Sequence, residues 1–248
     1  MNKVIAMIPA RLGSKRVKNK NLKEINGKPL ISYIVETAVK SNVFDEIYIN
    51  SESEIFKDIA DKYGIKFYKR PEELSTDSAT NDQFALDFIE NNPCDTLVQL
   101  LSTSPFLRPE EIDNFVNEMT NKNYETFIAV NNIQIECIYD GKPLNFNQKG
   151  DTLPSQQLKP VQAYACGIMG WTTDRYIENI NKFGSAYHGG DGRTGFFELS
   201  GYSTIDIDSE EKFRLAELVS KHLEHLYNYE SNKCSEIIGQ TTCRTHQN

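Results

Sequence analysis

Short apolar runs alternate with amphipathic segments along the first 130 residues of the chain. The first run, Lys3–Ala10, is rich in β-branched residues and predicts a buried strand. Residues 29–41 then carry apolar side chains at helical spacing, with a proline suited to the first turn of a helix. The same pattern predicts further strands at 44–50, 66–68, 96–101 and 126–130, and further helices at 53–63, 82–91 and 108–120. This alternation favours an α/β fold, with a mostly parallel sheet and helices on both faces.

The alternation lapses between about residues 131 and 195, where Asn, Gln, Gly and Pro are frequent. We interpret this stretch as an inserted lobe for dimerisation or acceptor binding, with an ordinary surface loop as the alternative. A strand at 202–207 and a helix from 209 to about 229 are expected to follow it. Residues 231–248 lack periodicity and are expected to be disordered. The chain is thus predicted to form a single domain over residues 1–230.

Basic side chains are concentrated directly after the first strand. Residues 11–28 hold seven of the 27 Lys and Arg and only one of the 35 acidic residues. The whole chain carries a formal charge of −8, so its remainder carries about −14 and the positive patch is local. General nucleic-acid binding needs a broad basic face, which this balance excludes. The patch instead suits a compact polyanion such as a nucleoside triphosphate.

Cysteine usage and hydropathy indicate a cytoplasmic location. The five cysteines are scattered without a CxxC pair, which is typical of reduced thiols. No apolar stretch approaches the ~20 residues of a membrane span. No signal peptide is expected before the first strand, because the chain leads directly into it.

The basic loop that follows the first strand predicts a phosphate-binding site. It matches neither the P-loop nor the dinucleotide-binding glycine pattern. Gly13 would let the backbone approach a ligand, and the Ser14 hydroxyl would donate to a phosphate oxygen. Charge would come from Arg11, Lys15 and Lys20. A solvated basic turn is the alternative, but ligands of such sheets bind at the carboxyl ends of the strands.

Asp206-Ile207-Asp208 is a candidate magnesium site. On a strand, residues two apart face the same side, so both carboxylates would reach one divalent cation. A structural role competes with this hypothesis: Asp208 would be the N-cap of the following helix, with Glu211 completing a capping box.

Six segments together resemble the CMP-sugar synthetases, the cytidylyltransferases of sialic, legionaminic, pseudaminic and 3-deoxy-octulosonic acids. In chain order they are Ile8–Lys15 with Lys20–Leu22, Gly27–Leu30, Arg70–Leu74, Asp77–Thr80, Thr103–Arg108 and Asp206–Glu211. The resemblance implies a nucleotide-diphospho-sugar transferase-like, Rossmann-like fold and a homodimer. It also implies CTP-dependent, Mg²⁺-dependent transfer of CMP to a small acidic sugar, with release of pyrophosphate.

The resemblance also assigns site residues. Catalysis is expected from Arg11, Lys20, Asp206 and Asp208, the last two as metal ligands. CTP is expected to contact Arg11, Gly13, Ser14, Lys15, Lys20, Asn21, Arg70, Ala79 and Asn81, with Asn21, Arg70, Ala79 and Asn81 around the cytosine. Arg16 and Lys18 are further candidates for pyrophosphate. From the residues alone, Arg70 would equally form a surface ion pair with Glu72 or Glu73.

The acceptor side departs from the family. The resemblance assigns acceptor binding to Leu101, Ser102, Thr103 and Cys166, yet Leu101 stands where the family usually has Gln. Ser155 stands for an Arg and Cys166 for an Asn. Losing the Arg would remove a charge-assisted bond to a carboxylate, which Arg175, Arg193 or Lys159 would have to replace. Phe196 and Phe197 are expected to pack in the core rather than in the acceptor pocket.

The sequence leaves two alternatives to CMP transfer onto an acidic sugar. One is CMP transfer to a phosphonate, a phosphate ester or a polyol. The other is a catalytically silent nucleotide-binding subunit, against which the intact basic loop and aspartate pair argue.

Overall fold

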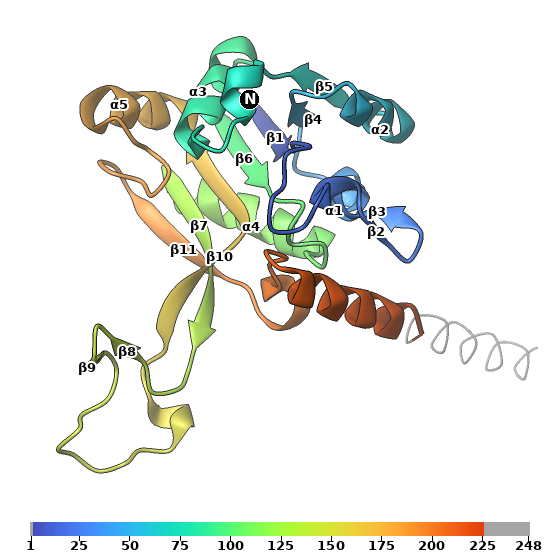
Figure 1. Ribbon diagram of the computed structural model, residues 1–248. Coiled ribbons are helices and arrows are strands. Elements are labelled where there is room, and N and C mark those ends of the chain that lie inside the picture. The colour runs from blue at the N-terminus through green and yellow to red at the C-terminus, as the bar shows by residue number, and fades with distance from the viewer. Residues whose placement is uncertain (1, 226–248) are drawn as a thin grey trace, which may run out of the picture.

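The computed structural model describes residues 2–225, which form an α/β fold around a seven-stranded sheet (Figure 1). Strand β10 is antiparallel to both of its neighbours, and the other pairings are parallel, so the predicted mostly parallel sheet is confirmed. In spatial order the strands are β11 (Thr194–Glu198), β7 (Thr126–Ile133), β10 (Val161–Thr172), β6 (Thr96–Leu100), β1 (Val4–Pro9), β4 (Glu46–Ser51) and β5 (Lys66–Lys69).

Helices cover both faces of this sheet, as the periodicity predicts. Alternate residues of β1 point to opposite faces, and both sets are buried. Ala6 and Ile8 belong to the core under one group of helices, whereas Ile5 and Met7 belong to the core under the other. The first group is α1 (Leu30–Lys40), α2 (Ile55–Tyr63) and α4 (Pro109–Asn121), and the second is α3 (Asn81–Asn91) and α5 (Thr173–Phe183).

Short elements complete the fold around the sheet. Helix α2 ends at Gly64, whose φ of 66° is the left-handed stop that the sequence indicates. The minor elements are β2 (Glu24–Ile25), β3 (Lys28–Pro29), β8 (Ile138–Tyr139), β9 (Lys142–Pro143) and the 3-10 turns η1 (Lys20–Leu22), η2 (Glu72–Ser75), η3 (Ser155–Gln157) and η4 (Gly201–Thr204).

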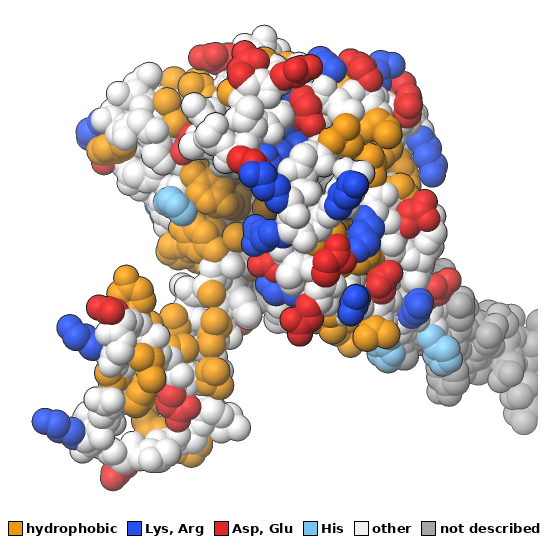
Figure 2. Space-filling model, in the orientation of Figure 1, with side chains coloured by type: hydrophobic (Ala, Val, Ile, Leu, Met, Phe, Trp, Pro, Cys, Tyr) orange, Lys and Arg blue, Asp and Glu red, His pale blue; other side chains and the backbone are white. Residues whose placement is uncertain are grey.

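An arm formed by residues 134–160 leaves the sheet between β7 and β10 (Figure 1). Ile138 and Tyr139 are 65% and 72% exposed, and apolar side chains run along much of the arm (Figure 2). The segment outside the core is narrower than the predicted lobe of residues 131–195. Ile168, Met169 and Trp171 are fully buried in β10 between β6 and β7, and α5 packs on the sheet. Phe197 packs against Phe115 and Phe127, while Phe196 is exposed.

The segment that carries the two aspartates is not a strand. Residues 201–204 form a 3-10 turn and 205–208 are irregular, so the prediction of a strand at 202–207 is wrong. A helix follows over residues 210–225. Its Phe213 packs with Ile207, Val17 and Leu30 in a third core cluster, which fixes this segment to the basic loop. The predicted end of the helix near residue 229 and the predicted disorder of 231–248 lie outside the described residues. Among residues 2–225, no helix has the length and apolar character needed to cross a membrane.

Phe213→Ala should lower the free energy of unfolding by about 3–4 kcal/mol, because the fully buried ring leaves a cavity beneath the aspartate segment. Urea denaturation followed by circular dichroism measures the loss. Leu218→Ala on the same helix, where the side chain is 66% exposed, should cost less than about 0.5 kcal/mol. Equal costs at the two positions would mean that the helix does not anchor through Phe213.

Candidate active site

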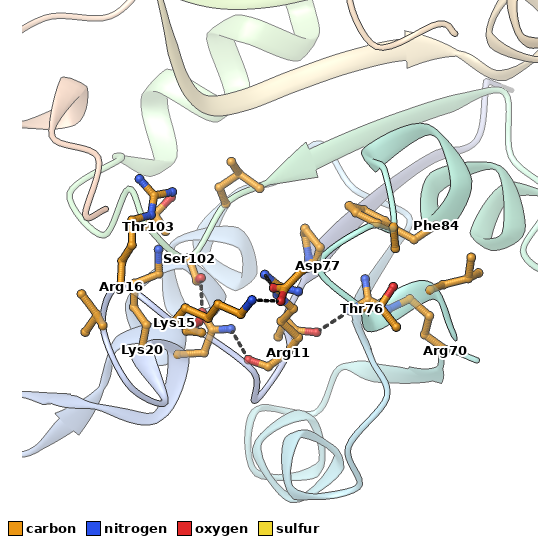
Figure 3. A pocket seen from close by; sticks show the side chains of 18 residues that line it. Arg11, Lys15, Arg16, Lys20, Arg70, Thr76, Asp77, Phe84, Ser102 and Thr103 are labelled. Carbon is orange, nitrogen blue, oxygen red and sulfur yellow. Dashed lines mark hydrogen bonds and ion pairs between the residues drawn. The ribbon is translucent and has the colours of Figure 1, made fainter. Parts of the chain in front are cut away.

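A cavity of about 320 Å³ opens at the carboxyl ends of β1 and β6 (Figure 3). One wall is the basic loop after β1, the second is the segment from Arg70 to Phe84, and the third is Leu101–Thr103 after β6. Seven of the nine predicted CTP-binding residues line it: Arg11, Ser14, Lys15, Lys20, Asn21, Arg70 and Ala79. Gly13 and Asn81 do not line it. The Nδ2 atom of Asn81 is buried without a hydrogen-bond partner at the start of α3.

The basic loop is fixed by hydrogen bonds from its own backbone and from Asn21. The Leu12 amide donates to Glu52 Oε1 at 2.9 Å. Asn21, which is 5% exposed, donates from Nδ2 to the Arg11 carbonyl at 3.1 Å and accepts at Oδ1 from the Ser102 hydroxyl at 2.6 Å. Asn21 thus ties the loop after β1 to the loop after β6. This connection holds the cationic side chains on a rigid support.

Arg11 and Lys15 converge on one carboxylate, that of Asp77 (Figure 3). Arg11 Nη2 lies 3.1 Å from Asp77 Oδ1, and Lys15 Nζ is bonded to the other carboxylate oxygen. The hydrogen bond from Lys15 lowers the pKa of Asp77 below its ordinary value. Asp77 is thus an internal anion placed between the two cations that the sequence assigns to phosphate.

Arg70 is a buried brace and not a surface ion-pair residue. It is 3% exposed, donates from Nη2 to the Ala10 carbonyl at 2.8 Å and from Nε to the Ser75 hydroxyl at 3.0 Å. Its charge faces Glu52 at 3.6 Å, so the alternative of a pair with Glu72 or Glu73 is wrong. Burial lowers the pKa of the guanidinium. The Phe84 ring lies 4.9 Å from the guanidinium carbon and gives the cavity an aromatic wall.

Lys20 joins the basic loop to the aspartate segment, although the two are 187 residues apart. Its Nζ donates to the Ile207 carbonyl at 2.8 Å, and the Ile207 amide donates to the Thr103 carbonyl at 2.8 Å. Burial lowers the pKa of Lys20, and the nearby Asp206 carboxylate opposes this shift. Lys20 of the basic loop therefore lies next to the segment that carries the two aspartates.

Asp208 is not the helix cap. The Ser209 hydroxyl accepts the Lys212 amide at 3.2 Å, so Ser209 fills the N-cap position that the sequence offered to Asp208. Asp208 instead faces Lys212 Nζ at 3.0 Å and Arg16 Nη1 at 3.5 Å. Asp208 is therefore not used as a helix cap, and its carboxylate is shared between two cations.

The donor set at this point suits magnesium only together with a substrate. Within residues 2–225, no group of three or more His, Cys, Asp or Glu side chains is placed to hold a metal ion. Mg²⁺ in nucleotide sites, however, is bound through one or two carboxylates plus substrate phosphates. Asp206 and Asp208, beside the cavity of the basic loop, fit that requirement.

The predicted acceptor residues divide between two cavities. Leu101, Ser102 and Thr103 line the first, whereas Cys166 lines a second cavity of about 290 Å³ together with Asp206 and Lys212. Cys166 lies in a bulge of β10 with a φ of 55°, and burial raises the pKa of its thiol. The Leu101 amide donates to the carbonyl of Gly167 at 3.0 Å, so Leu101 in the first cavity is bonded to the residue that follows Cys166.

The three cations that the sequence offers for an acceptor carboxylate lie elsewhere. Arg175 pairs with Glu125 at 2.8 Å, just before the start of β7 and hence at the amino end of the sheet. Arg193 stacks on Tyr124 at the same end. Lys159 lines a cavity within the arm. Lys212 and Asp77 are the charged residues that sequence reasoning missed, because each looks like an ordinary surface charge.

The chain is similar to known proteins in both sequence and fold. Residues 5–161 match the family model described as Cytidylyltransferase. The chain belongs to this family. A curated relative, N-acylneuraminate cytidylyltransferase of Escherichia coli O18:K1:H7, is 38% identical over 52% of this chain and 31% of its own length. Several curated relatives are about twice as long as the region that this chain matches.

Two further matches cover most of both chains. Post-translational flagellin modification protein B of Campylobacter coli is 30% identical over 89% of this chain and 96% of its own length. Among solved structures, CMP:2-keto-3-deoxy-manno-octonic acid synthetase complexed with CTP superposes with a TM-score of 0.67, at 15% identity, over 89% of this chain and 99% of that one. The latter is a likeness of fold, and it agrees with the predicted nucleotidyltransferase architecture.

Arg70→Met should lower the free energy of unfolding by about 2–4 kcal/mol. The change leaves the Ala10 carbonyl without its donor and Glu52 without its buried counter-charge. Urea denaturation measures the effect, with Lys69→Met as the control because its side chain is half-exposed. A loss below about 1 kcal/mol for Arg70→Met would contradict its role as a brace.

Proposed function

We propose that this chain is a CTP-dependent enzyme that transfers CMP to an acidic sugar of the nonulosonic or ulosonic type and releases pyrophosphate. The observation that carries the proposal is the contact between Lys20, which lines the cavity of the basic loop, and the carbonyl of Ile207, the residue between the two aspartates. Membership of the cytidylyltransferase family supports the nucleotide, and the names of the relatives support the acceptor class.

The reaction needs no nucleophile from the protein. An acceptor hydroxyl oxygen attacks the α-phosphorus of CTP, the bond from that phosphorus to the β-phosphate oxygen breaks, and pyrophosphate leaves with the electron pair. Positioning and charge neutralisation are the main contributions of the protein to such transfers. The hydroxyl proton leaves to water or to an oxygen in the site, because no general base is evident among the residues assigned here.

We assign the triphosphate to Arg11, Ser14, Lys15 and Lys20, with Gly13 in the same loop. Arg16, which also lines the cavity, is a further candidate for pyrophosphate. The cytosine would lie on the other side of the cavity, near Asn21, Arg70 and Ala79, with Phe84 as an aromatic wall. Asn81 does not line this cavity, so we assign it no contact with the cytosine.

Asp206 and Asp208 would hold Mg²⁺, which in such sites neutralises the charge that develops on the phosphate oxygens. Their position next to the loop assigned to the triphosphate supports this assignment, because the phosphates would complete the set of oxygen ligands. Leu101, Ser102, Thr103 and Cys166 would face the acceptor from the boundary between the two cavities.

We also propose that the chain forms a homodimer and that it is located in the cytoplasm. The arm supports the dimer. Ile135, Ile138 and Tyr139 are all more than half exposed on it, and a second copy would remove such apolar side chains from water. The three cysteines in the described residues, Cys94, Cys137 and Cys166, are unpaired, which suits a reducing compartment.

Release of pyrophosphate, measured in a coupled assay with CTP, Mg²⁺ and a panel of acceptors, tests the proposed transfer. The panel contains N-acetylneuraminic acid and 3-deoxy-manno-octulosonic acid, with a phosphonate, a phosphate ester and a polyol as the alternatives. Turnover with the acidic sugars alone is the expected result. Binding of CTP without turnover on any acceptor would instead support a silent nucleotide-binding subunit.

Asp206→Asn should reduce the rate of pyrophosphate release at least about 100-fold, because it removes a charge from the centre where the phosphates react. The protein should stay folded, with a small decrease in melting temperature, because Asp206 is partly buried and its charge faces Lys20. Glu210→Gln is the control, an exposed carboxylate of the same segment that pairs with Lys23. Equal rates for the Asp206 variant and the wild type would remove Asp206 from the site.

Asp77→Asn should strengthen CTP binding about two- to five-fold, because Asp77 competes with the triphosphate for Arg11 and Lys15. Isothermal titration calorimetry measures the Kd, and the gain should shrink as salt is added. Glu73→Gln, an exposed carboxylate in the same segment, should leave the Kd unchanged. Weaker binding by the Asp77 variant would mean that this ion pair positions the loop instead.

A further inference from the structure

We propose that Glu111 and Ser203 position Asp206 for the metal ion that accompanies the nucleotide. The inference rests on the proposed function, in which Asp206 is a ligand of Mg²⁺. It is carried by the hydrogen bond that the Ser203 hydroxyl donates to Glu111 Oε2 at 2.7 Å. Neither residue lines the two cavities of the site, so both act through the segment that carries Asp206.

This hydrogen bond is buried at both ends. Ser203 is 4% exposed and Glu111 is 7% exposed. A hydroxyl that donates to a carboxylate makes a charge-assisted bond, which is shorter and stronger than a bond between neutral groups. The contact of the same hydroxyl with the Phe106 carbonyl is longer, at 3.3 Å. Because water has little access to it, the bond between Ser203 and Glu111 fixes the turn η4 to helix α4.

Glu111 is itself held on a rigid support. Its Oε2 atom accepts from the Arg108 amide at 2.9 Å, which caps the first turn of α4, and its Oε1 atom accepts from the Arg108 guanidinium at 2.8 Å. Ile112 and Phe115 of the same helix are fully buried in the core. The capping bonds would form equally well with Glu111 exposed to water, so its burial against Ser203 indicates a second role.

The aspartate segment is fixed on both sides of Asp206. After Asp206, Ile207 is hydrogen-bonded at both its amide and its carbonyl. Before Asp206, Ser203 ties the segment to α4, whereas the other hydrogen bonds of residues 201–206 in the described structure stay within the segment. Asp208, by contrast, lies between Ile207 and the helix that Ser209 caps. Loss of the Ser203 bond would therefore loosen Asp206 and leave Asp208 in place.

A metal ion is sensitive to such a loss of positioning. Mg²⁺ requires near-ideal octahedral geometry, with oxygen ligands at about 2.0–2.1 Å. Groups that orient metal ligands typically contribute about 10- to 100-fold to metal affinity. Ser203 acts on the backbone that carries the ligand and not on the carboxylate itself, so we expect an effect at the lower end of that range.

The test measures by isothermal titration calorimetry how much Mg²⁺ strengthens CTP binding, as the ratio of the Kd in EDTA to the Kd in Mg²⁺. Ser203→Ala should lower this ratio at least about five-fold, because Asp206 is no longer held in place. Its Kd in EDTA should stay within about two-fold of the wild type, since Ser203 lies outside the nucleotide cavity. The Mg²⁺ concentration for half-maximal pyrophosphate release should rise about 5- to 20-fold.

Ser41→Ala is the matched control. The Ser41 hydroxyl donates to Asp113 Oδ1 at 2.6 Å and so joins the end of α1 to the same helix, α4. Ser41 is also buried, so the two substitutions remove the same kind of bond from one helix. Both should lower the melting temperature by about 3–8 °C. Ser41→Ala should leave the effect of Mg²⁺ on CTP binding unchanged, whereas a general loss of stability would reduce it in both variants.

Two further variants show whether Ser203 acts through Asp206. Asp206→Asn should remove most of the effect of Mg²⁺ on CTP binding. Adding Ser203→Ala to it should cause no further loss, because the two changes affect one ligand. Glu111→Gln keeps an oxygen that accepts from Ser203, so it should retain about half or more of the wild-type ratio.

The inference is overturned if Ser203→Ala binds CTP with the wild-type response to Mg²⁺, or if Ser41→Ala loses as much of that response. A further loss on adding Ser203→Ala to Asp206→Asn would also overturn it. If Mg²⁺ does not strengthen CTP binding to the wild type, the metal assignment and this inference fail together. If it does, but no acceptor yields pyrophosphate, the proposed transfer fails and the titrations still decide the role of Ser203.

Discussion

The site depends on one hydrogen bond, from the Lys20 ammonium to the Ile207 carbonyl. It closes a loop of 187 residues and leaves a lysine in a place where burial lowers its pKa. A buried ammonium is costly unless anions and acceptors surround it. Asp206 and the Ile207 carbonyl supply them, and a triphosphate would add more. A polyanion in the cavity would therefore add favourable charge to Lys20, as a nucleotide site needs.

Two further interactions hold the walls of the cavity in the same way, by joining segments that are distant in sequence. Arg70 connects the end of β1 to the 3-10 turn η2, and Asn21 connects the basic loop to Ser102 after β6. These side chains are 3% and 5% exposed, so their bonds are shielded from water and geometrically restricted. By contrast, the pairs of Asp77 with Arg11 and Lys15 are partly exposed, so a ligand can exchange with them. Rigid walls and exchangeable charges thus coexist in one cavity.

The sequence predicted those features that depend on local periodicity. The predicted strands and helices of the first 130 residues lie within about two residues of their expected bounds, except that β7 continues three residues further, to Ile133. The helices bury one side against the sheet and the central strand β1 buries both, which are the patterns that periodicity detects. The Asp206 segment failed, because its short apolar alternation resembles a strand while its residues pack against the basic loop and not on a neighbouring strand. The stretch interpreted as an inserted lobe contains the central strand β10 and helix α5. The apolar run Ala163–Trp171 makes up most of β10, but the polar segments on both sides of it interrupt the alternation that would place it in the sheet.

The candidate site was predictable where charged residues had no partners of opposite charge nearby in the sequence. Seven basic residues crowded into one loop cannot neutralise each other, so they indicate a ligand. Lys212 gave no such signal, because four residues after Asp208 on a helix it has an ordinary ion-pair partner. Its position beside a cavity depends on the bulge of β10, because Cys166 in that bulge lines the same cavity. The periodicity of the sequence does not reveal this bulge.

Cys166 lines the second cavity from the bulge of β10. A φ of 55° favours Asn or Gly over Cys, so the backbone conformation does not account for a cysteine at the bulge. The thiol is a weak donor and a weak acceptor, and it replaces the amide that the resembling family has at this position. Beside Leu101 and Ala165, it makes the boundary of the second cavity less able to bond hydroxyl groups.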